Sequence, residues 1–211
     1  LLLNLIFGAE IGLFCLIVLG IVPREASLYL EAALALYVHW ASVEDATILF
    51  VRSIPFFLAL PLTESFDNFN TWRILSLILF GRWLWKYSDK RQATSYYDLL
   101  RRIWRSKVAI GLVVLLILAG ASLINAPDFN AGARRIIYFV NLSLVGIVIY
   151  DTSRFSPLAS RSLIKSISIA TILAITVGYI QVIATYFIDI YQFMRIWGEG
   201  IQMRQFGTVW S

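Results

Sequence analysis

Two arginines in the last segment of the sequence are the side chains best suited to holding a negatively charged group. Arg195 stands just after the end of a long apolar run. The glycines of Gly198-Glu199-Gly200 are expected to break the helix there, and the segment that follows, which contains Arg204, is expected to return toward the membrane. A guanidinium donates hydrogen bonds from a planar fork, so it can hold a diphosphate bidentately without a metal ion. Both arginines also fit ordinary anchors at a membrane surface, and the residue types alone favour that interpretation.

A second polar segment, residues 63–73, interleaves amides, carboxylates and hydroxyls with Phe66, Phe69 and Trp72, and it ends at Arg73. This mixture suits carbohydrate, because polar groups bind sugar hydroxyls while aromatic faces stack on sugar C–H groups. An aromatic belt around a solvated turn has a similar composition, and composition favours the belt.

Few charged residues interrupt the apolar runs, and each is costly at membrane depth. Glu10 and Arg52 are expected about 14 and 9 Å from one membrane face. We predict that they form a buried ion pair that fixes the register of the helices; the alternative is a substrate or ion path. Glu31 is expected too far from Arg52 to pair with it and to face an outward cavity.

The sequence offers no pattern for metal or nucleophilic chemistry. His39, the only histidine, stands beside Trp40 and is expected to be a belt residue. A single cysteine, Cys15, cannot form an internal disulfide. We therefore predict no metal, no cofactor and no catalytic residue in this chain.

The composition requires a membrane environment to position these residues. The 211 residues are 59% hydrophobic and 15% charged, against about 25% charged in a soluble domain. This excludes disulfide-rich secreted scaffolds, disordered tails and ordinary cytosolic enzymes. The net charge of +5 is that of a multi-pass protein with basic inner loops, not that of a nucleic-acid-binding protein.

Seven apolar runs approach the length of about 20 residues that a spanning helix needs. They are residues 1–22, 26–41, 46–62, 71–87, 107–124, 134–150 and 162–188. The sequence thus predicts an all-α bundle of about seven spans, with Pro55 kinking the third. We interpret residues 1–211 as one transmembrane domain, the N-terminal portion of a larger membrane protein.

The basic residues predict which side of each span faces the cytoplasm. Eleven are expected on one side: Arg82, Lys86, Lys90, Arg91, Arg101, Arg102, Arg105, Lys107, Arg154, Arg161 and Lys165. Six are expected on the other: Arg24, Arg73, Arg134, Arg135, Arg195 and Arg204. The first set is assigned to the cytoplasm. Around residues 95–105, apolar and basic faces predict an amphipathic helix lying on anionic membrane lipids, or alternatively a docking site for a cytosolic partner.

The segment Arg204-Gln205-Phe206-Gly207-Thr208 resembles the Arg-x-x-Gly-Thr motif that follows a central transmembrane helix in the O-antigen ligase and polymerase family of bacterial polysaccharide-assembly proteins. Residues 52–61, with two prolines, are similar to an early helix of some members.

The resemblance implies metal-independent glycan transfer at the outer face of the bacterial inner membrane, from a polyprenyl (undecaprenyl) diphosphate carrier to a lipid or glycan acceptor. By matching position, Arg204 helps to bind the diphosphate and Gly207 permits close backbone approach. Arg195 and Arg73 are the other candidate substrate-binding residues. The family's proposed catalytic histidine lies further along, so residues 1–211 alone are expected to be inactive.

Two rival functions come from other classes. A fragment of a secondary transporter or flippase would use Glu10 and Arg52 as path residues. A structural membrane subunit would bind no substrate.

Overall fold

The computed structural model describes residues 2–18, 21–23, 25–57, 71–88, 106–155, 157–184 and 186–187, and every regular element in these ranges is a helix. Seven α-helices lie in these ranges: α1 (Leu2–Val18), α2 (Ala26–Trp40), α3 (Val43–Ser53), α4 (Thr71–Ser88), α6 (Lys107–Ser122), α7 (Phe129–Phe155) and α8 (Pro157–Ala184). Two 3₁₀ turns, η1 (Ile54–Phe56) and η2 (Leu123–Asn125), follow α3 and α6. The described residues contain no strand, which confirms the predicted all-α class.

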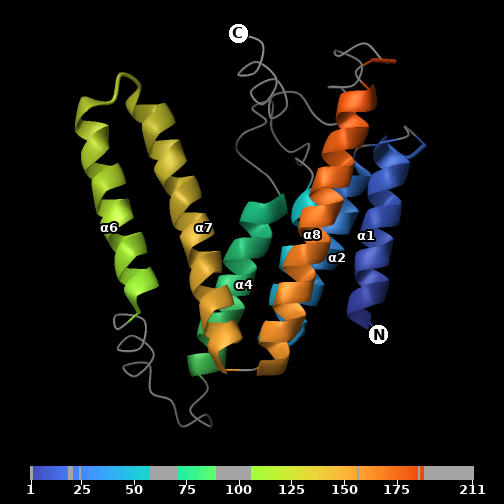
Figure 1. The fold of residues 1–211 in the computed structure, drawn as a ribbon, viewed down its shortest axis with the longest axis horizontal. Coiled ribbons are helices and arrows are strands. Elements are labelled where there is room, and N and C mark those ends of the chain that lie inside the picture. Colours follow the sequence, from blue (N-terminus) through green and yellow to red (C-terminus); the bar gives the residue numbers. More distant parts are fainter. Residues whose placement is uncertain are drawn as a thin grey trace.

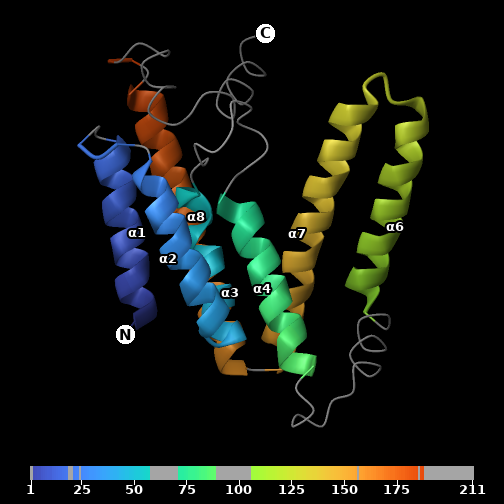
Figure 2. The same cartoon turned by 180° about the vertical axis from the view of Figure 1, so that it is seen from behind.

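The helices run alternately up and down between two ends of the bundle. The lower end in Figure 1 holds Trp40, Ser88, Lys107 and Phe155, and the upper end holds Val18, Thr71, Ser122 and Ala184. The short helix α3 is central, since it contacts α1, α2, α4, α7 and α8. Helix α6 lies at one side of the bundle and packs on α7, which in turn packs on α4 (Figure 1). The reverse view shows α2 and α3 between α1 and α4 (Figure 2).

Local sequence explains where several helices begin and end. The Ser42 hydroxyl caps α3 by accepting a hydrogen bond of 3.1 Å from the backbone N–H of Asp45. Pro157 opens α8 at a position where its missing N–H costs nothing. Pro55 was expected to kink the third apolar run, and α3 does end at Ser53, with η1 in its place.

The main core forms where α2, α3, α4 and α7 meet. Its buried side chains are Leu34, Val38, Val43, Ala46, Leu49, Phe50, Leu75, Leu79, Trp83, Val145 and Val148. Trp83 is the largest fully buried one, and its Nε1–H donates to Asp151 Oδ2 over 2.9 Å, joining α4 to α7. Close packing and such interhelical hydrogen bonds hold helices together where no water is present to drive association.

Fewer helices than expected have the length and composition of a membrane span. Within the described ranges, Phe129–Arg154 of α7 and Pro157–Ile180 of α8 are long and apolar enough to cross a membrane. Leu2–Ile17 and Ala109–Ser122 are apolar but shorter. The prediction of seven spans is therefore not met: α3 has only 11 residues, or about 16 Å of helix. The long helices also begin earlier than predicted, at Phe129 instead of 134 and at Pro157 instead of 162.

The predicted amphipathic helix at residues 95–105 lies outside the described residues, as does most of the polar segment 63–73.

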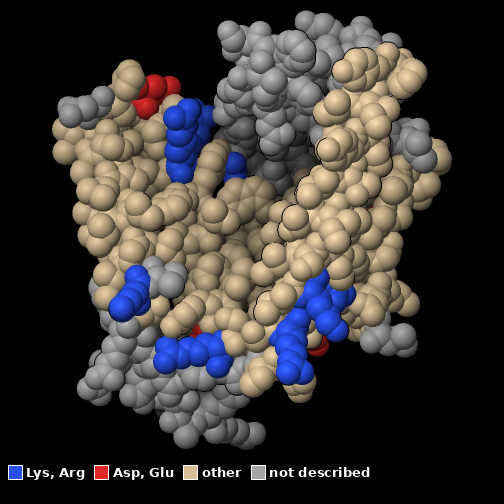
Figure 3. Space-filling view, in the orientation of Figure 1, with Lys and Arg blue, Asp and Glu red and all other residues tan. Residues whose placement is uncertain are grey.

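Basic side chains gather at the ends of the bundle and leave an uncharged band between them (Figure 3). The described helices place Arg82, Lys86, Lys107, Arg154, Arg161 and Lys165 toward the lower end and Arg73, Arg134 and Arg135 toward the upper end. Large apolar side chains on α6 and α8 are exposed in the band, among them Ile117 at 65% and Ile172 at 63%. A surface of this kind fits a lipid environment.

Candidate functional site

Arg73 is the one predicted substrate-binding residue that the structure describes. It stands at the third position of α4, at the upper end, and it is partly buried. Its guanidinium carbon lies 3.8 Å from the centre of the Tyr138 ring on α7 and 5.6 Å from that of Trp72. Cation–π contact of this kind holds the guanidinium in a fixed position.

Polar side chains join α4 to α7 next to Arg73. The Ser76 hydroxyl lies 2.9 Å from the Arg73 carbonyl oxygen and 2.7 Å from Asn141 Oδ1 on α7. Both Ser76 and Asn141 are buried. Arg73 is therefore held on a rigid contact between two helices, which is the arrangement a binding residue needs.

The other three predicted substrate-binding residues, Arg195, Arg204 and Gly207, lie outside the described residues. Helix α8 ends at Ala184 at the upper end, the end at which Arg73 lies.

The predicted ion pair between Glu10 and Arg52 is wrong. Arg52 Nε donates to Ser166 Oγ on α8 over 3.0 Å, and Arg52 Nη1 donates to Asn4 Oδ1 on α1 over 2.8 Å. Glu10 Oε2 instead accepts a hydrogen bond of 2.5 Å from the Ser53 hydroxyl. Successive residues of a helix point about 100° apart, so Ser53 reaches Glu10 while Arg52 lies between Asn4 of α1 and Ser166 of α8.

Glu31, which was expected to face an outward cavity, lines a pocket together with Glu10. That pocket is enclosed by Glu10 of α1, by Ser27, Leu30, Glu31 and Leu34 of α2, by Phe56 of η1 and by Thr71 of α4. Glu10 and Glu31 are 1% and 6% exposed. Two carboxyl groups thus meet in one nearly dry space, and charge placed there is held in a low-dielectric surrounding.

Helical spacing carried a signal for this pocket. Ser27, Glu31 and Leu34 repeat at intervals of four and three residues, which places them on one face of α2. The sequence could therefore predict that this face of α2 is buried. It could not predict which residue of α1 packs against it, because that depends on how the two helices are positioned.

The lower end carries a second polar arrangement, between α3 and α4. Lys86 Nζ lies 2.8 Å from Glu44 Oε1, and both side chains are about one-third exposed. Partial burial alone would raise the pKa of Glu44. The hydrogen bond from Lys86, a hydrogen bond from the Glu44 backbone and the charge of Lys86 outweigh it and hold that pKa below its ordinary value.

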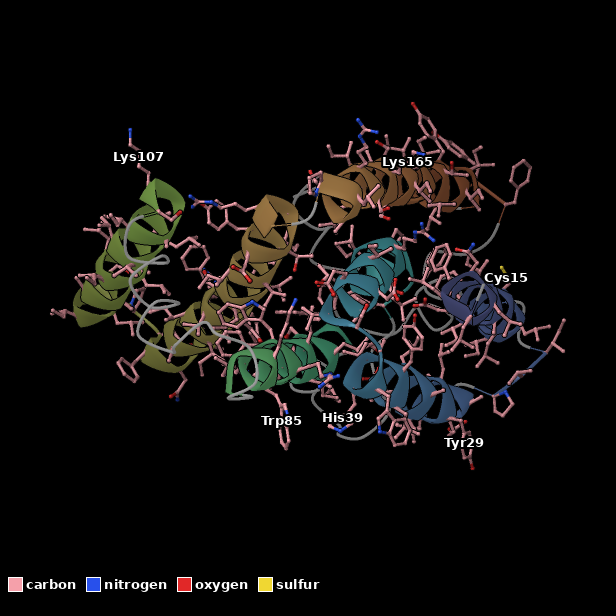
Figure 4. The ribbon with its side chains drawn as sticks, turned by 90° about the horizontal axis from the view of Figure 1, so that it is seen from below. Cys15, Tyr29, His39, Trp85, Lys107 and Lys165 are labelled. Carbon is pink, nitrogen blue, oxygen red and sulfur yellow. The ribbon has the colours of Figure 1, made fainter. Side chains whose placement is uncertain are left out.

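An open groove of about 460 Å³ between α2 and α4 is lined by His39, Trp40, Ile78, Gly81, Arg82 and Trp85. Figure 4 shows His39 and Trp85 pointing outward on the same side of the bundle. The rings of His39 and Trp40 meet edge to face with centres 6.1 Å apart. This exposed aromatic setting is the one expected for a belt residue.

The described residues bring together no group of three or more His, Cys, Asp or Glu side chains that could hold a metal ion. Comparison with known protein families, with characterised proteins and with solved structures finds no match to this chain.

Proposed function

We propose that this chain is part of an O-antigen ligase-like membrane glycosyltransferase, which moves a glycan from a polyprenyl diphosphate carrier to an acceptor at the outer face of the bacterial inner membrane. The observation that carries the proposal is the segment Arg204-Gln205-Phe206-Gly207-Thr208, which resembles the family motif. The structure adds one supporting fact: α8, the helix that precedes the motif in the sequence, ends at the same end of the bundle as Arg73.

The distribution of charge supports the orientation that the proposal needs. The lower end carries twice as many described basic side chains as the upper end, six against three. Basic residues collect on the cytoplasmic side of membrane proteins, so the lower end is cytoplasmic and Arg73 faces outward. In this proposal the bundle crosses the membrane as a multi-pass domain, in which the helices shorter than a full span pack against α7 and α8.

Arg73 has the chemistry to assist in binding the carrier. Stacking on Tyr138 uses the face of the guanidinium, whereas its N–H donors lie in the plane of the group. A charge-assisted hydrogen bond from such a donor contributes about 1.5–3 kcal/mol. Arg204 and Arg195 would complete a cationic set around the diphosphate, with Gly207 allowing the backbone to approach it.

The test is glycan attachment by the full-length protein carrying Arg204→Lys, with Arg161→Lys as the matched control. Lysine keeps the charge but loses the bidentate fork, so Arg204→Lys is expected to abolish most polymer attachment while membrane insertion stays normal. Arg161 is exposed near the lower end of α8, far from the outer face, and its substitution is expected to change nothing. Normal attachment by Arg204→Lys would contradict the proposed role.

The orientation is tested by labelling a cysteine placed at position 204 with an impermeant reagent, in a Cys15→Ser background because Cys15 is exposed. We expect labelling from outside intact cells. Labelling only after the inner face is opened to the reagent would remove the basis of the mechanism.

A secondary transporter or flippase is the second candidate, favoured by the two carboxyl groups buried at the pocket between α1 and α2. Ionisable groups at membrane depth commonly mark a path for ions or protons. This function predicts altered uptake after Glu10→Gln, with polymer attachment intact after Arg204→Lys.

A further inference from the structure

The pocket between α1, α2 and α4 has an excess of hydrogen-bond acceptors. Its polar lining consists of the Glu10 and Glu31 carboxyl groups and the Ser27 and Thr71 hydroxyls. Both oxygens of Glu31 and the Ser27 hydroxyl are buried, and none of them has a partner at full hydrogen-bond distance and angle, although the Thr71 side chain lies near Glu31 on the pocket wall. A buried polar group without a partner is costly, so these oxygens call for a positively charged or donating ligand.

No basic side chain of the described residues supplies that charge. Arg52, the predicted partner of Glu10, donates to Asn4 and Ser166 instead. The ion pair found in the described part of the chain, Lys86 with Glu44, lies at the lower end. The single proton of the Ser53 hydroxyl is directed to Glu10 Oε2.

The small size of the pocket limits which cations could bind in it. The space between the lining atoms has no room for a water molecule, so a hydrated ion is excluded. Mg²⁺ keeps several of its waters when it binds, and Ca²⁺ takes six to eight oxygen ligands. A dehydrated monovalent cation smaller than water needs neither. Carboxylate and hydroxyl oxygens are the ligands that such a hard cation prefers.

We propose that Glu10, Ser27, Glu31 and Thr71 form a binding site for a dehydrated monovalent cation of the size of Na⁺, held between α1, α2 and α4. The ion would neutralise charge that is otherwise buried, and it would tie together three helices. The site is distinct from Arg73 and does not depend on the proposed glycan transfer.

The test measures the thermal unfolding midpoint of the purified full-length protein in detergent, at constant ionic strength, in sodium, potassium or choline chloride. Binding to the folded state alone should raise the midpoint saturably, by about 5–10 °C at one hundred times the dissociation constant. Sodium is expected to act, and choline, which is too large for the pocket, is not. Equal midpoints in sodium and choline would overturn the proposal.

Two substitutions locate the ion, and a third serves as control. Glu31→Gln should abolish the sodium response, and Ser27→Ala, which removes one hydroxyl ligand, should weaken the sodium affinity by about tenfold. Glu44→Gln removes a carboxylate that lies outside the pocket and should leave the response intact. If Glu31→Gln does not fold, Ser27→Ala alone decides the matter. An unchanged sodium response in Ser27→Ala, or stabilisation by protons without any effect of sodium, would overturn the proposal.

Discussion

Double-mutant cycles can decide whether Glu10 is hydrogen-bonded to Ser53 or forms an ion pair with Arg52. The structure gives Glu10 a buried hydrogen bond of 2.5 Å from the Ser53 hydroxyl, and Ser53 is 0% exposed. A hydrogen bond to a charged group contributes about 1.5–3 kcal/mol, and leaving a buried acceptor unpaired costs a similar amount. Ser53→Ala should therefore lower the free energy of unfolding by about 1.5–3 kcal/mol.

The coupling energies separate the two pairings more sharply than the single substitutions. Glu10→Ala combined with Ser53→Ala should show a coupling of about 1–3 kcal/mol, because each substitution removes the same bond. Glu10→Ala combined with Arg52→Ala should show about 0.5 kcal/mol or less, because Arg52 bonds to Asn4 and Ser166 and shares no hydrogen-bond partner with Glu10.

The assay is reversible unfolding of the full-length protein in mixed detergent micelles, followed by helical circular dichroism. Breaking a buried ion pair costs about 3–5 kcal/mol, so a genuine Glu10–Arg52 pair would give a large coupling in the second cycle. Strong coupling there together with none between Glu10 and Ser53 would refute the packing of α1 on α3 described above.

Two further predictions concern the contacts of α4. Trp83→Phe should lower the free energy of unfolding by about 1–3 kcal/mol, because it removes the indole bond to Asp151 and part of a buried ring; the same change at Trp85, which is 67% exposed, should alter it by no more than about 0.5 kcal/mol, and equal losses would contradict the helix register. The Lys86–Glu44 pair should contribute up to about 1 kcal/mol, since both side chains are partly solvated. The pKa of Glu44 is lowered in the folded state, so this contribution is complete above the unfolded-state pKa and is lost as the pH falls through the folded-state pKa. The measurement is the difference in unfolding free energy between wild type and Lys86→Ala at pH 7 and at pH 3, and a difference that does not shrink at pH 3 would count against the pair.

Hydropathy predicted the long helices well, and proline positions predicted where a helix ends. The two long apolar runs became α7 and α8, and Pro55 ends α3 because proline lacks the N–H that the next turn requires. Helix length was predicted less well. Residues 46–62 form one apolar run in the sequence, but α3 ends after 11 residues. Mean hydropathy over a segment does not show where a helix within it ends.

Arg73 shows how much of a candidate binding site can be predicted from the sequence. Its position at the border of an apolar run predicted a cation near the membrane surface. The ring of Tyr138, 65 residues further along and on another helix, could not be anticipated as its partner.

The sequence by itself determined an all-helical chain with long apolar runs and with its basic residues sorted between two ends, because hydropathy and charge act residue by residue. Only the tertiary structure decided which polar groups meet inside the bundle. The rotation of each helix and its height against its neighbours set those contacts, and side-chain packing fixes both. That is why Glu10 lies against Ser53 and shares a pocket with Glu31, while Arg52 turns toward α8.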